Sequence, residues 1–235
     1  MKKVKVSLDS RFYDILIGED LISNFPIYLE GILSQTLADE DNIIQLIQAQ
    51  YQSILSFSGH FTQASFRTNS KTAPRKAEGE VSYKRPGKMR WMYAAPEDQL
   101  LVTNGDTLWL YDTLLENVTI QKLEKLTNGT ALSFLLGLGD LNKDFKLRKV
   151  SKPLLKSPQG LIVELEPNKE TVNLSFIQLE VDSKNYNLRK IALMDHQGNY
   201  RTIALESMIY NLTLEDKFFE FEVSAEMEVI EVYDK

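Results

Sequence analysis

The chain has 235 residues and an apolar content of 43%, which is ample for a sizeable core in one large antiparallel domain or in two smaller domains. Its formal net charge of −6 and its scattered lysines and arginines argue against a nucleic-acid-binding protein, because such proteins gather positive charge to neutralise phosphates. The absence of cysteine excludes disulfides, a thiol nucleophile and thiolate metal ligands.

The sequence predicts neither a membrane-spanning helix nor a secretory signal peptide. No run of about eighteen consecutive apolar residues occurs, so we expect a soluble protein. Met1-Lys2-Lys3 supplies the basic start of a signal peptide, but charged residues and a proline interrupt the apolar segment that must follow. The interrupting residues are Asp14, Glu19, Asp20, Pro26 and Glu30.

Residues 1–38 differ in pattern from the rest of the chain. Apolar and polar residues alternate in Val4–Leu8 and in Tyr13–Ile17, on either side of a polar turn. This pattern predicts two short strands. The stretch from Tyr13 to Leu21 resembles the opening strand of dehydroquinate synthases, and the weak likeness spans residues 1–25. The glycine-rich nucleotide-binding and metal-binding segments of that family have no counterpart here. Residues 1–38 are therefore an extension of unclear origin, for which a tag, a fused fragment and a misplaced start codon all stay open.

A helical pattern begins at Asp39. The acidic residues 39–41 suit a helix N-terminus, and apolar residues follow at three- and four-residue spacing up to Ile54. This pattern predicts one amphipathic helix that ends near Ser56. A strand then starts at Phe57, and a polar loop runs from Arg67 to Lys76.

The central block from Gly79 to Asp112 predicts a series of β-hairpins rich in aromatic residues. Asn104-Gly105 is a strong two-residue hairpin signal. A further strand is expected from Val118 to Leu123, and the nearly uncharged stretch from Thr130 to Leu138 predicts a short helix. Three groups should each share one face of a strand: Val81, Tyr83 and Arg85; Met89, Trp91 and Tyr93; and Thr107, Trp109 and Tyr111.

The C-terminal half repeats the pattern of strands and turns at roughly ten-residue spacing, without long helices between the strands. This spacing predicts antiparallel neighbours, and the tail from Ser224 to Val232 could add an edge strand. The expected strands are Gly160–Glu166, Thr171–Val181, Leu188–Met194, Tyr200–Ile209 and Phe218–Val223.

The predicted fold class is mainly β with α: a single large antiparallel sheet, curled into a half-open barrel and covered by a few short helices. A sheet that curls around short helices tends to leave a concave apolar pocket. The same pattern also fits a filled core, because aromatic-rich strands usually pack against one another.

No catalytic or metal-binding constellation can be recognised in the sequence. The two histidines, His60 and His196, fall in a strand and in a turn, and no pair of carboxylates is singled out for acid–base chemistry. No phosphate-binding glycine loop is present. We therefore expect no enzymatic activity, no metal and no cofactor.

The central block also resembles a known family. Gly79 to Trp91, with its Arg85-Pro86-Gly87 turn, and the stretch from Pro96 to Asp112 resemble the bacterial outer-membrane lipoprotein carrier, LolA. The likeness begins near Asp39 and covers about four fifths of the chain. Its other parts are Phe57 to Gln63, Leu132 to Leu138, Gly139-Asp140-Leu141 with Asp144-Phe145, and Phe218 to Phe221.

The resemblance implies a half-open barrel, residues 39–235, whose apolar cavity holds the acyl chains of a lipoprotein. It implies a periplasmic monomer that carries its cargo from the inner to the outer membrane and binds no nucleic acid. The implied partners are acylated lipoproteins and the inner-membrane lipoprotein-releasing ABC transporter. An outer-membrane receptor stays open as a further partner.

The resemblance also assigns roles to individual residues. Arg85 matches the arginine whose hydrogen bonds to the lid helices stabilise the closed, empty form. Met89 falls near the cavity mouth, where the family contacts its transfer partner. The implied wall residues are Trp91, Trp109 and Tyr111, and the implied lid residues are Leu132, Phe134, Leu135 and Leu136.

Two other interpretations remain beside the carrier. One is a lipid-sensing regulatory domain of the same fold, and the other is a fragment related to dehydroquinate synthase, against which the missing segments count heavily. A carrier differs from a sensor because it forms a soluble stoichiometric complex with a lipoprotein and hands the lipoprotein on.

Overall fold

A computed structural model describes residues 2–8, 11–17, 42–124, 135–150, 152–156, 160–171 and 173–231 of the chain. The chain divides into two compact units, Met1–Ile43 and Ile44–Lys235. In the first unit, β1 (Lys2–Leu8) pairs antiparallel with β2 (Arg11–Ile17), which confirms the two strands predicted there.

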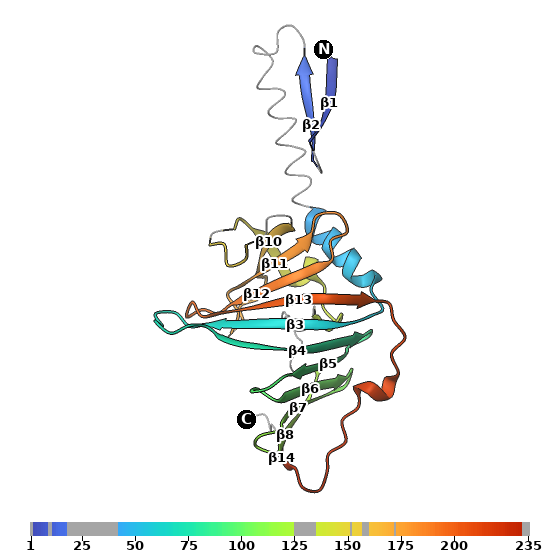
Figure 1. The fold of residues 1–235 in the computed structure, drawn as a ribbon, viewed down its shortest axis with the longest axis vertical. Helices are drawn as coiled ribbons and strands as arrows, with labels where there is room; N and C mark the ends of the chain where they lie inside the picture. The colour runs from blue at the N-terminus through green and yellow to red at the C-terminus, as the bar shows by residue number, and fades with distance from the viewer. Residues whose placement is uncertain are drawn as a thin grey trace. The chain divides into compact units, whose positions relative to one another are not determined.

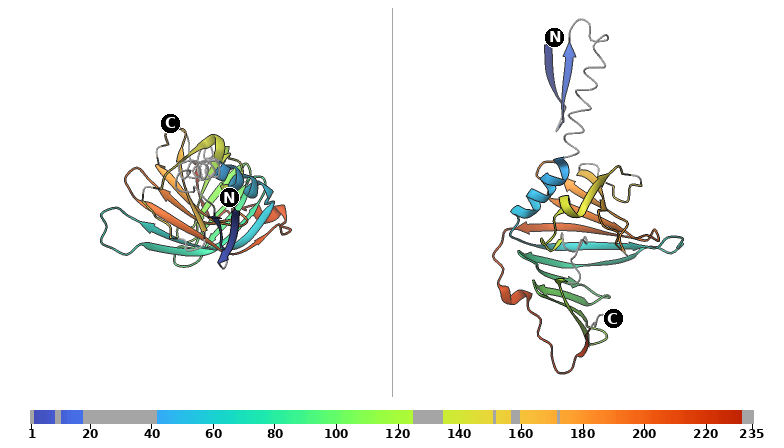
Figure 2. Two further views of the ribbon diagram at one scale, coloured as in Figure 1. Left: turned by 90° about the horizontal axis from the view of Figure 1, so that it is seen from above. Right: turned by 180° about the vertical axis from the view of Figure 1, so that it is seen from behind.

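The second unit contains one sheet of twelve strands (Figure 1). Their spatial order is β14-β8-β7-β6-β5-β4-β3-β13-β12-β11-β10-β9, so β14 and β9 form the two edges. The sheet curls without closing into a barrel (Figure 2), which confirms the predicted half-open sheet. The strands are β3 (Ser56–Phe66), β4 (Arg75–Lys84), β5 (Lys88–Tyr93), β6 (Gln99–Asn104), β7 (Thr107–Asp112), β8 (Asn117–Lys122), β9 (Phe145–Arg148), β10 (Gly160–Pro167), β11 (Phe176–Asp182), β12 (Leu188–Met194), β13 (Tyr200–Tyr210) and β14 (Glu228–Glu231).

The pairing is antiparallel between all neighbours from β8 to β9 in this order. It is parallel between β14 and β8, so the expectation of a purely antiparallel sheet was wrong at this edge. The cause is the connection before β14, which crosses the sheet and lets the chain enter in the direction of β8. The expected edge strand in the tail is confirmed.

Little helix is present in the described part of the chain. A helix covers residues 42–53, as predicted from the apolar spacing, and two short elements follow, α4 (Leu141–Asp144) and the 3₁₀ turn η1 (Asp216–Phe219). The short helix expected at Thr130 to Leu138 lies mostly outside the described residues, because residues 125–134 are not described. None of the described helices is long and apolar enough to cross a membrane.

The strand expected at Phe218–Val223 is replaced by η1 and irregular chain. The aromatic residues of this stretch face the sheet. The stretch itself is not a strand and lies across the strands of the sheet. Phe219 is fully buried, and the ring centroid of Phe221 lies 5.5 Å from that of Tyr111. We call residues 211–227 the C-terminal strap; Figure 1 shows it in red, running past β4 to β8 before it reaches β14.

The strand register defines two faces of the sheet. Phe57 lies beside Tyr83 and Tyr83 beside Met89, while Val81 lies beside Trp91, so these side chains share one face. The helix over residues 42–53 packs on this face, since the rings of Tyr51 and Tyr83 are 6.1 Å apart. We call it the inner face. The strap covers part of the opposite, outer face.

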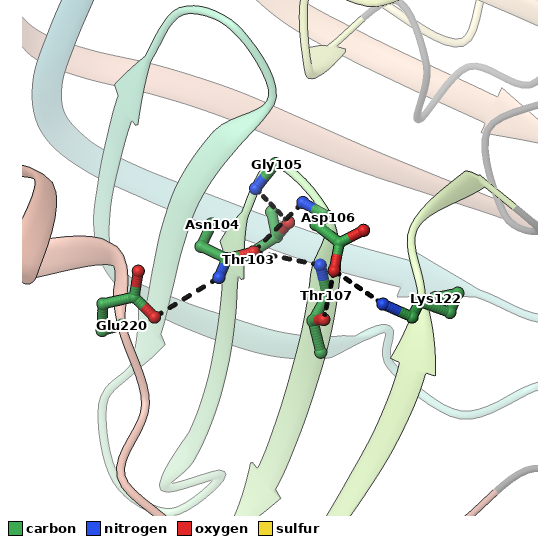
Figure 3. Close-up of polar contacts among 7 residues, drawn as sticks. All are labelled: Thr103, Asn104, Gly105, Asp106, Thr107, Lys122 and Glu220. Carbon is green, nitrogen blue, oxygen red and sulfur yellow. Dashed lines mark hydrogen bonds and ion pairs between the residues drawn. The ribbon is translucent and has the colours of Figure 1, made fainter.

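The hairpin between β6 and β7 shows how local sequence sets this geometry (Figure 3). Its two loop residues are Gly105 and Asp106, one position later than the expected Asn104-Gly105 pair, and Gly105 adopts a φ of +99° that favours glycine. The Asn104 side chain accepts hydrogen bonds from the backbone N–H groups of Asp106 and Thr107, each at 3.0 Å. It also donates to Glu220 of the strap at 3.3 Å.

Candidate functional site

Arg85 directly follows β4 and joins the sheet to two other segments. Its Nη2 donates to the backbone oxygen of Tyr51 at 3.0 Å, its Nε to that of Ile54 at 3.4 Å, and its Nη1 to that of Gly137 at 3.0 Å. The first two acceptors lie at the C-terminal end of the helix, where carbonyls have no partner within the helix and a cation is favoured. We call these three bonds the latch.

The third acceptor belongs to residues 135–141, which we call the lid segment. Besides Arg85, the helix holds this segment directly: the buried amide of Gln48 accepts from the backbone N–H of Leu141 at 2.9 Å. The Tyr51 hydroxyl donates to the backbone oxygen of Leu135. The backbone N–H of Gly87 donates to the oxygen of Leu136 at 3.1 Å, so the turn after Arg85 binds the lid segment as well.

Gly137 allows the lid segment to approach the sheet closely. Its φ of +66° favours glycine, and a Cβ atom placed on it would lie 2.0 Å from the hydroxyl oxygen of Tyr83. Tyr83 is fully buried, and its hydroxyl has no hydrogen-bond partner in the described structure. Burial therefore raises the pKa of the Tyr83 hydroxyl, while the charge of Arg85 lowers it to a smaller extent.

The inner face beneath these segments is apolar and strongly aromatic. The ring centroids of Phe57 and Tyr83 are 5.0 Å apart, and Phe61 lies 4.6 Å from Trp91 and 4.9 Å from Tyr93. Such stacked and edge-on rings bury large apolar areas with favourable mutual geometry. The face therefore offers contacts for an apolar ligand.

The structure brings together part of the predicted site. Arg85, Met89 and Trp91 lie on or beside the inner face, where Met89 and Trp91 are 2% and 8% exposed. Leu136 is fully buried, and Leu135 contributes its backbone oxygen to Tyr51. Leu132 and Phe134 lie outside the described residues, and the assignment of all four residues to a lid stays a prediction.

Trp109 and Tyr111 lie on the other face. Trp109 is paired with Val102 of β6 and Ile120 of β8, whose side chains lie on the outer face. The rings of Trp109 and Tyr111 both contact Phe221 of the strap. They do not join Met89 and Trp91 on one wall. The physical reason is the strand period of two, which sends neighbouring residues to opposite faces and makes β7 present Leu108 and Leu110 inward.

Sequence reasoning missed three residues of this arrangement. Tyr51 fits the apolar spacing of the helix and Gly137 lies in the stretch that predicts a short helix, so neither pattern indicates the contacts that these residues make. The partner of Gln48 could not be found from the sequence, because it is a backbone group 93 positions away. The spacing of Gln48 and Tyr51 by three residues does place both on one side of the helix, which is the one local indication.

Other buried polar groups have structural roles. Glu164 is fully buried on the outer face, where its carboxylate pairs with Arg148 at 2.9 Å and accepts from Gln178 at 2.7 Å. Gln178 in turn binds the backbone of Lys152 and Leu154 and so fixes the segment that covers this part of the sheet. Within the described ranges, no group of three or more His, Asp or Glu residues could hold a metal ion.

Comparisons with known proteins place the sequence in a family. The family model described as "Outer membrane lipoprotein carrier protein LolA" matches residues 52–222. An outer-membrane lipoprotein carrier protein of Pseudomonas aeruginosa is 30% identical over 195 residues, which cover 83% of this chain and 90% of that protein. The protein of that name from Coxiella burnetii is 29% identical over 218 residues, or 92% of this chain and 97% of the relative.

Among solved structures, a LolA superfamily protein from Nitrosomonas europaea superposes with a TM-score of 0.42 at 15% identity, over 75% of this chain and 97% of that one. The assignment rests on the sequence match, which extends from the end of the helix through the sheet and into the strap. The chain belongs to the LolA family of outer-membrane lipoprotein carrier proteins.

Proposed function

We propose that this chain is a periplasmic chaperone that binds the acyl chains of lipoproteins on its inner face and carries them from the inner to the outer membrane. The observation that carries the proposal is the latch, through which one guanidinium joins the sheet, the helix and the lid segment. In this role the chain takes its cargo from the inner-membrane lipoprotein-releasing ABC transporter. An outer-membrane receptor is the recipient that fits such a route.

The free energy of the latch is large enough to stabilise the empty carrier and small enough for the burial of acyl chains to offset it. Hydrogen bonds to a charged group make a net contribution of about 1.5–3 kcal/mol each, so three amount to roughly 5–9 kcal/mol. Burying one methylene of an acyl chain gains about 0.8 kcal/mol. Roughly six to eleven methylenes therefore offset the latch, and the acyl chains of a lipoprotein supply more.

Arg85→Leu tests the proposal. Without the latch, the closed form loses stability relative to the open, loaded form, so we expect the variant to bind cargo at least as well as the natural chain and to release it more slowly. The control is Arg90→Leu, which makes the same change in charge on the outer face, where Arg90 lies over the ring of Phe218.

The measurement uses membranes that contain a triacylated lipoprotein, the releasing transporter and ATP. Mass spectrometry of the soluble fraction detects the complex, and its transfer to acceptor vesicles is then followed in time. A carrier forms a soluble stoichiometric complex and hands it on, whereas a sensor of the same fold binds lipid without transfer. Failure of the natural chain and of Arg85→Leu to solubilise any acylated protein contradicts the proposal.

A further inference from the structure

The inner face ends in a group of arginines at the side opposite the latch. A pocket of about 920 Å³ lies there, between the β3–β4 hairpin and the β12–β13 hairpin. Arg67, Arg75 and Arg201 line it, and we call this part of the molecule the arginine end. Ser70, Thr72 and Asn173 line it as well.

The strand register places the arginine end on the inner face. Ser65 is paired with Arg75 on one side and with Arg201 on the other, and it lies on the same side of β3 as Phe57 and Phe61. Burial raises the pKa of the Tyr93 hydroxyl and Arg201 lowers it, as expected for a guanidinium near the inner-face aromatic residues. We call this side of β3 the floor: it is apolar from Phe57 to Phe61, continues through the polar Gln63 and Ser65, and ends at the arginines.

The length of this floor fits a lipid. From Phe57 to Ser65 the strand extends about 26 Å, at about 3.3 Å per residue. One leaflet of a bilayer has a hydrocarbon thickness of about 15 Å, half of the full core. An acyl chain that lies along the inner face therefore leaves room for a headgroup at the arginine end.

Two of the three guanidinium groups are available to a ligand. Arg75 is held by Glu97, to which its Nε donates at 2.8 Å. Arg67 and Arg201 are exposed, and their guanidinium groups have neither a hydrogen bond nor an ion pair with any described residue. The one carboxylate among the residues that line the pocket, Asp195, already accepts hydrogen bonds from the backbone and side-chain N–H groups of Asn199, each at 2.8 Å.

We propose that the arginine end binds the phosphate of a phospholipid headgroup, while the acyl chains of that lipid lie on the inner face. This proposal rests on the proposed function, because it needs an inner face that accepts acyl chains. Guanidinium groups match phosphate oxygens in geometry and form charge-assisted bonds with them. The site extends the ligands of this chain from acylated proteins to free anionic lipids.

The test compares three probes with the full chain by isothermal titration calorimetry: dihexanoyl phosphatidic acid, dihexanoylglycerol and inorganic phosphate. The two lipids differ only in the phosphate, and both are used below the concentration at which they aggregate. We expect the phosphatidic acid to bind about tenfold to a hundredfold more tightly than the neutral lipid, as for one or two charge-assisted bonds.

The double variant Arg67→Gln/Arg201→Gln should lose this preference and keep its affinity for dihexanoylglycerol. Both side chains are exposed, so the substitutions leave the core intact. The control is Arg90→Gln/Arg189→Gln, which removes the same charge away from the pocket; Arg90 lies on Phe218 and Arg189 pairs with Asp182. The control should keep the full preference for phosphatidic acid.

Three other outcomes would each overturn the phospholipid site, and one of them would also overturn the proposed function. Equal affinity of the natural chain for the two lipids overturns the phosphate site alone, because the inner face still takes acyl chains. Inorganic phosphate that binds as tightly as phosphatidic acid shows a site for free phosphate and overturns the lipid assignment. Binding of neither lipid overturns the proposed function together with this site.

Discussion

At the scale of single residues, the closed arrangement depends on contacts that only one residue type can make. Gly137 is the clearest case, because it combines a φ of +66° with a Cβ position 2.0 Å from the Tyr83 hydroxyl. Its backbone oxygen is also an acceptor of the latch. The lid segment therefore reaches Arg85 only because this position lacks a side chain.

Gly137→Ala should lower the free energy of unfolding. Overpacking costs about 1–3 kcal/mol, and alanine at positive φ adds about 1 kcal/mol or more. Urea unfolding followed by tryptophan fluorescence measures the loss. A double variant with Tyr83→Phe should recover part of it, because removal of the hydroxyl leaves only the backbone strain. Equal stability of Gly137→Ala and the natural chain would contradict the close approach.

Tyr83→Phe alone should stabilise the protein. A fully buried hydroxyl without a partner costs roughly 1–3 kcal/mol of desolvation, and phenylalanine keeps the ring contacts with Phe57 and Tyr51. We expect the free energy of unfolding in urea to rise by about 1 kcal/mol. Tyr51→Phe is the matched comparison and should lower it, because that hydroxyl donates to Leu135. A loss of stability in Tyr83→Phe would reveal a partner for its hydroxyl.

At the scale of elements, the C-terminal strap is held to the outer face by charge as well as by aromatic contacts. The carboxylate of Asp216 lies 2.7 Å from Lys84 Nζ and 2.8 Å from Lys88 Nζ. Hydrogen bonds from Lys84 and then from Lys88 lower the pKa of Asp216 from 3.8 to about 2. Next to it, Lys84 also donates to the backbone oxygen of Leu214 at 2.6 Å.

The strap should loosen as the pH falls from about 4 to about 2. Because the pKa of Asp216 is lower in the folded state, its ion pairs stabilise the strap above pH 3.8, and this contribution is lost as the pH falls towards the folded value of about 2. Hydrogen exchange of the Phe218 and Glu220 amides should accelerate in this window relative to amides of β3. In Asp216→Asn the strap amides should exchange faster already at neutral pH, and the acceleration between pH 4 and 2 should disappear. An unchanged pH dependence in that variant would contradict the assignment.

The elements also show what the sequence could predict. Strands with clear alternation and turn residues at their ends were predicted closely, and Leu188–Met194 has the bounds of β12. Phe218–Val223 has the same local pattern but lies across the sheet, because its aromatic residues bury against other strands. Trp91 and Trp109 look alike in sequence, yet register with their neighbours sends them to opposite faces. Such choices depend on long-range pairing, which local periodicity does not contain.

At the scale of the whole molecule, the chain combines a family domain with an N-terminal segment of different character. The boundary between the two compact units falls at Ile43 and Ile44, and the family model begins at residue 52. The helix over residues 42–53 supplies buried side chains to the second unit, among them Ile47 and Tyr51. Residues 1–38 precede that helix, so we propose that the carrier domain, residues 39–235, folds without them.

Removal of residues 1–38 should therefore leave the free energy of unfolding of the sheet unit within about 0.5 kcal/mol of the full chain, as for a change away from the core. Both tryptophans, Trp91 and Trp109, lie in the sheet, so urea unfolding followed by their fluorescence measures this unit alone. The control removes residues 1–53 and with them Gln48 and Tyr51, whose backbone oxygen is one acceptor of the latch. It should lower the midpoint strongly, because buried side chains and the hold on the lid segment are lost together. A similar drop after removal of residues 1–38 would show that the extension belongs to the carrier domain.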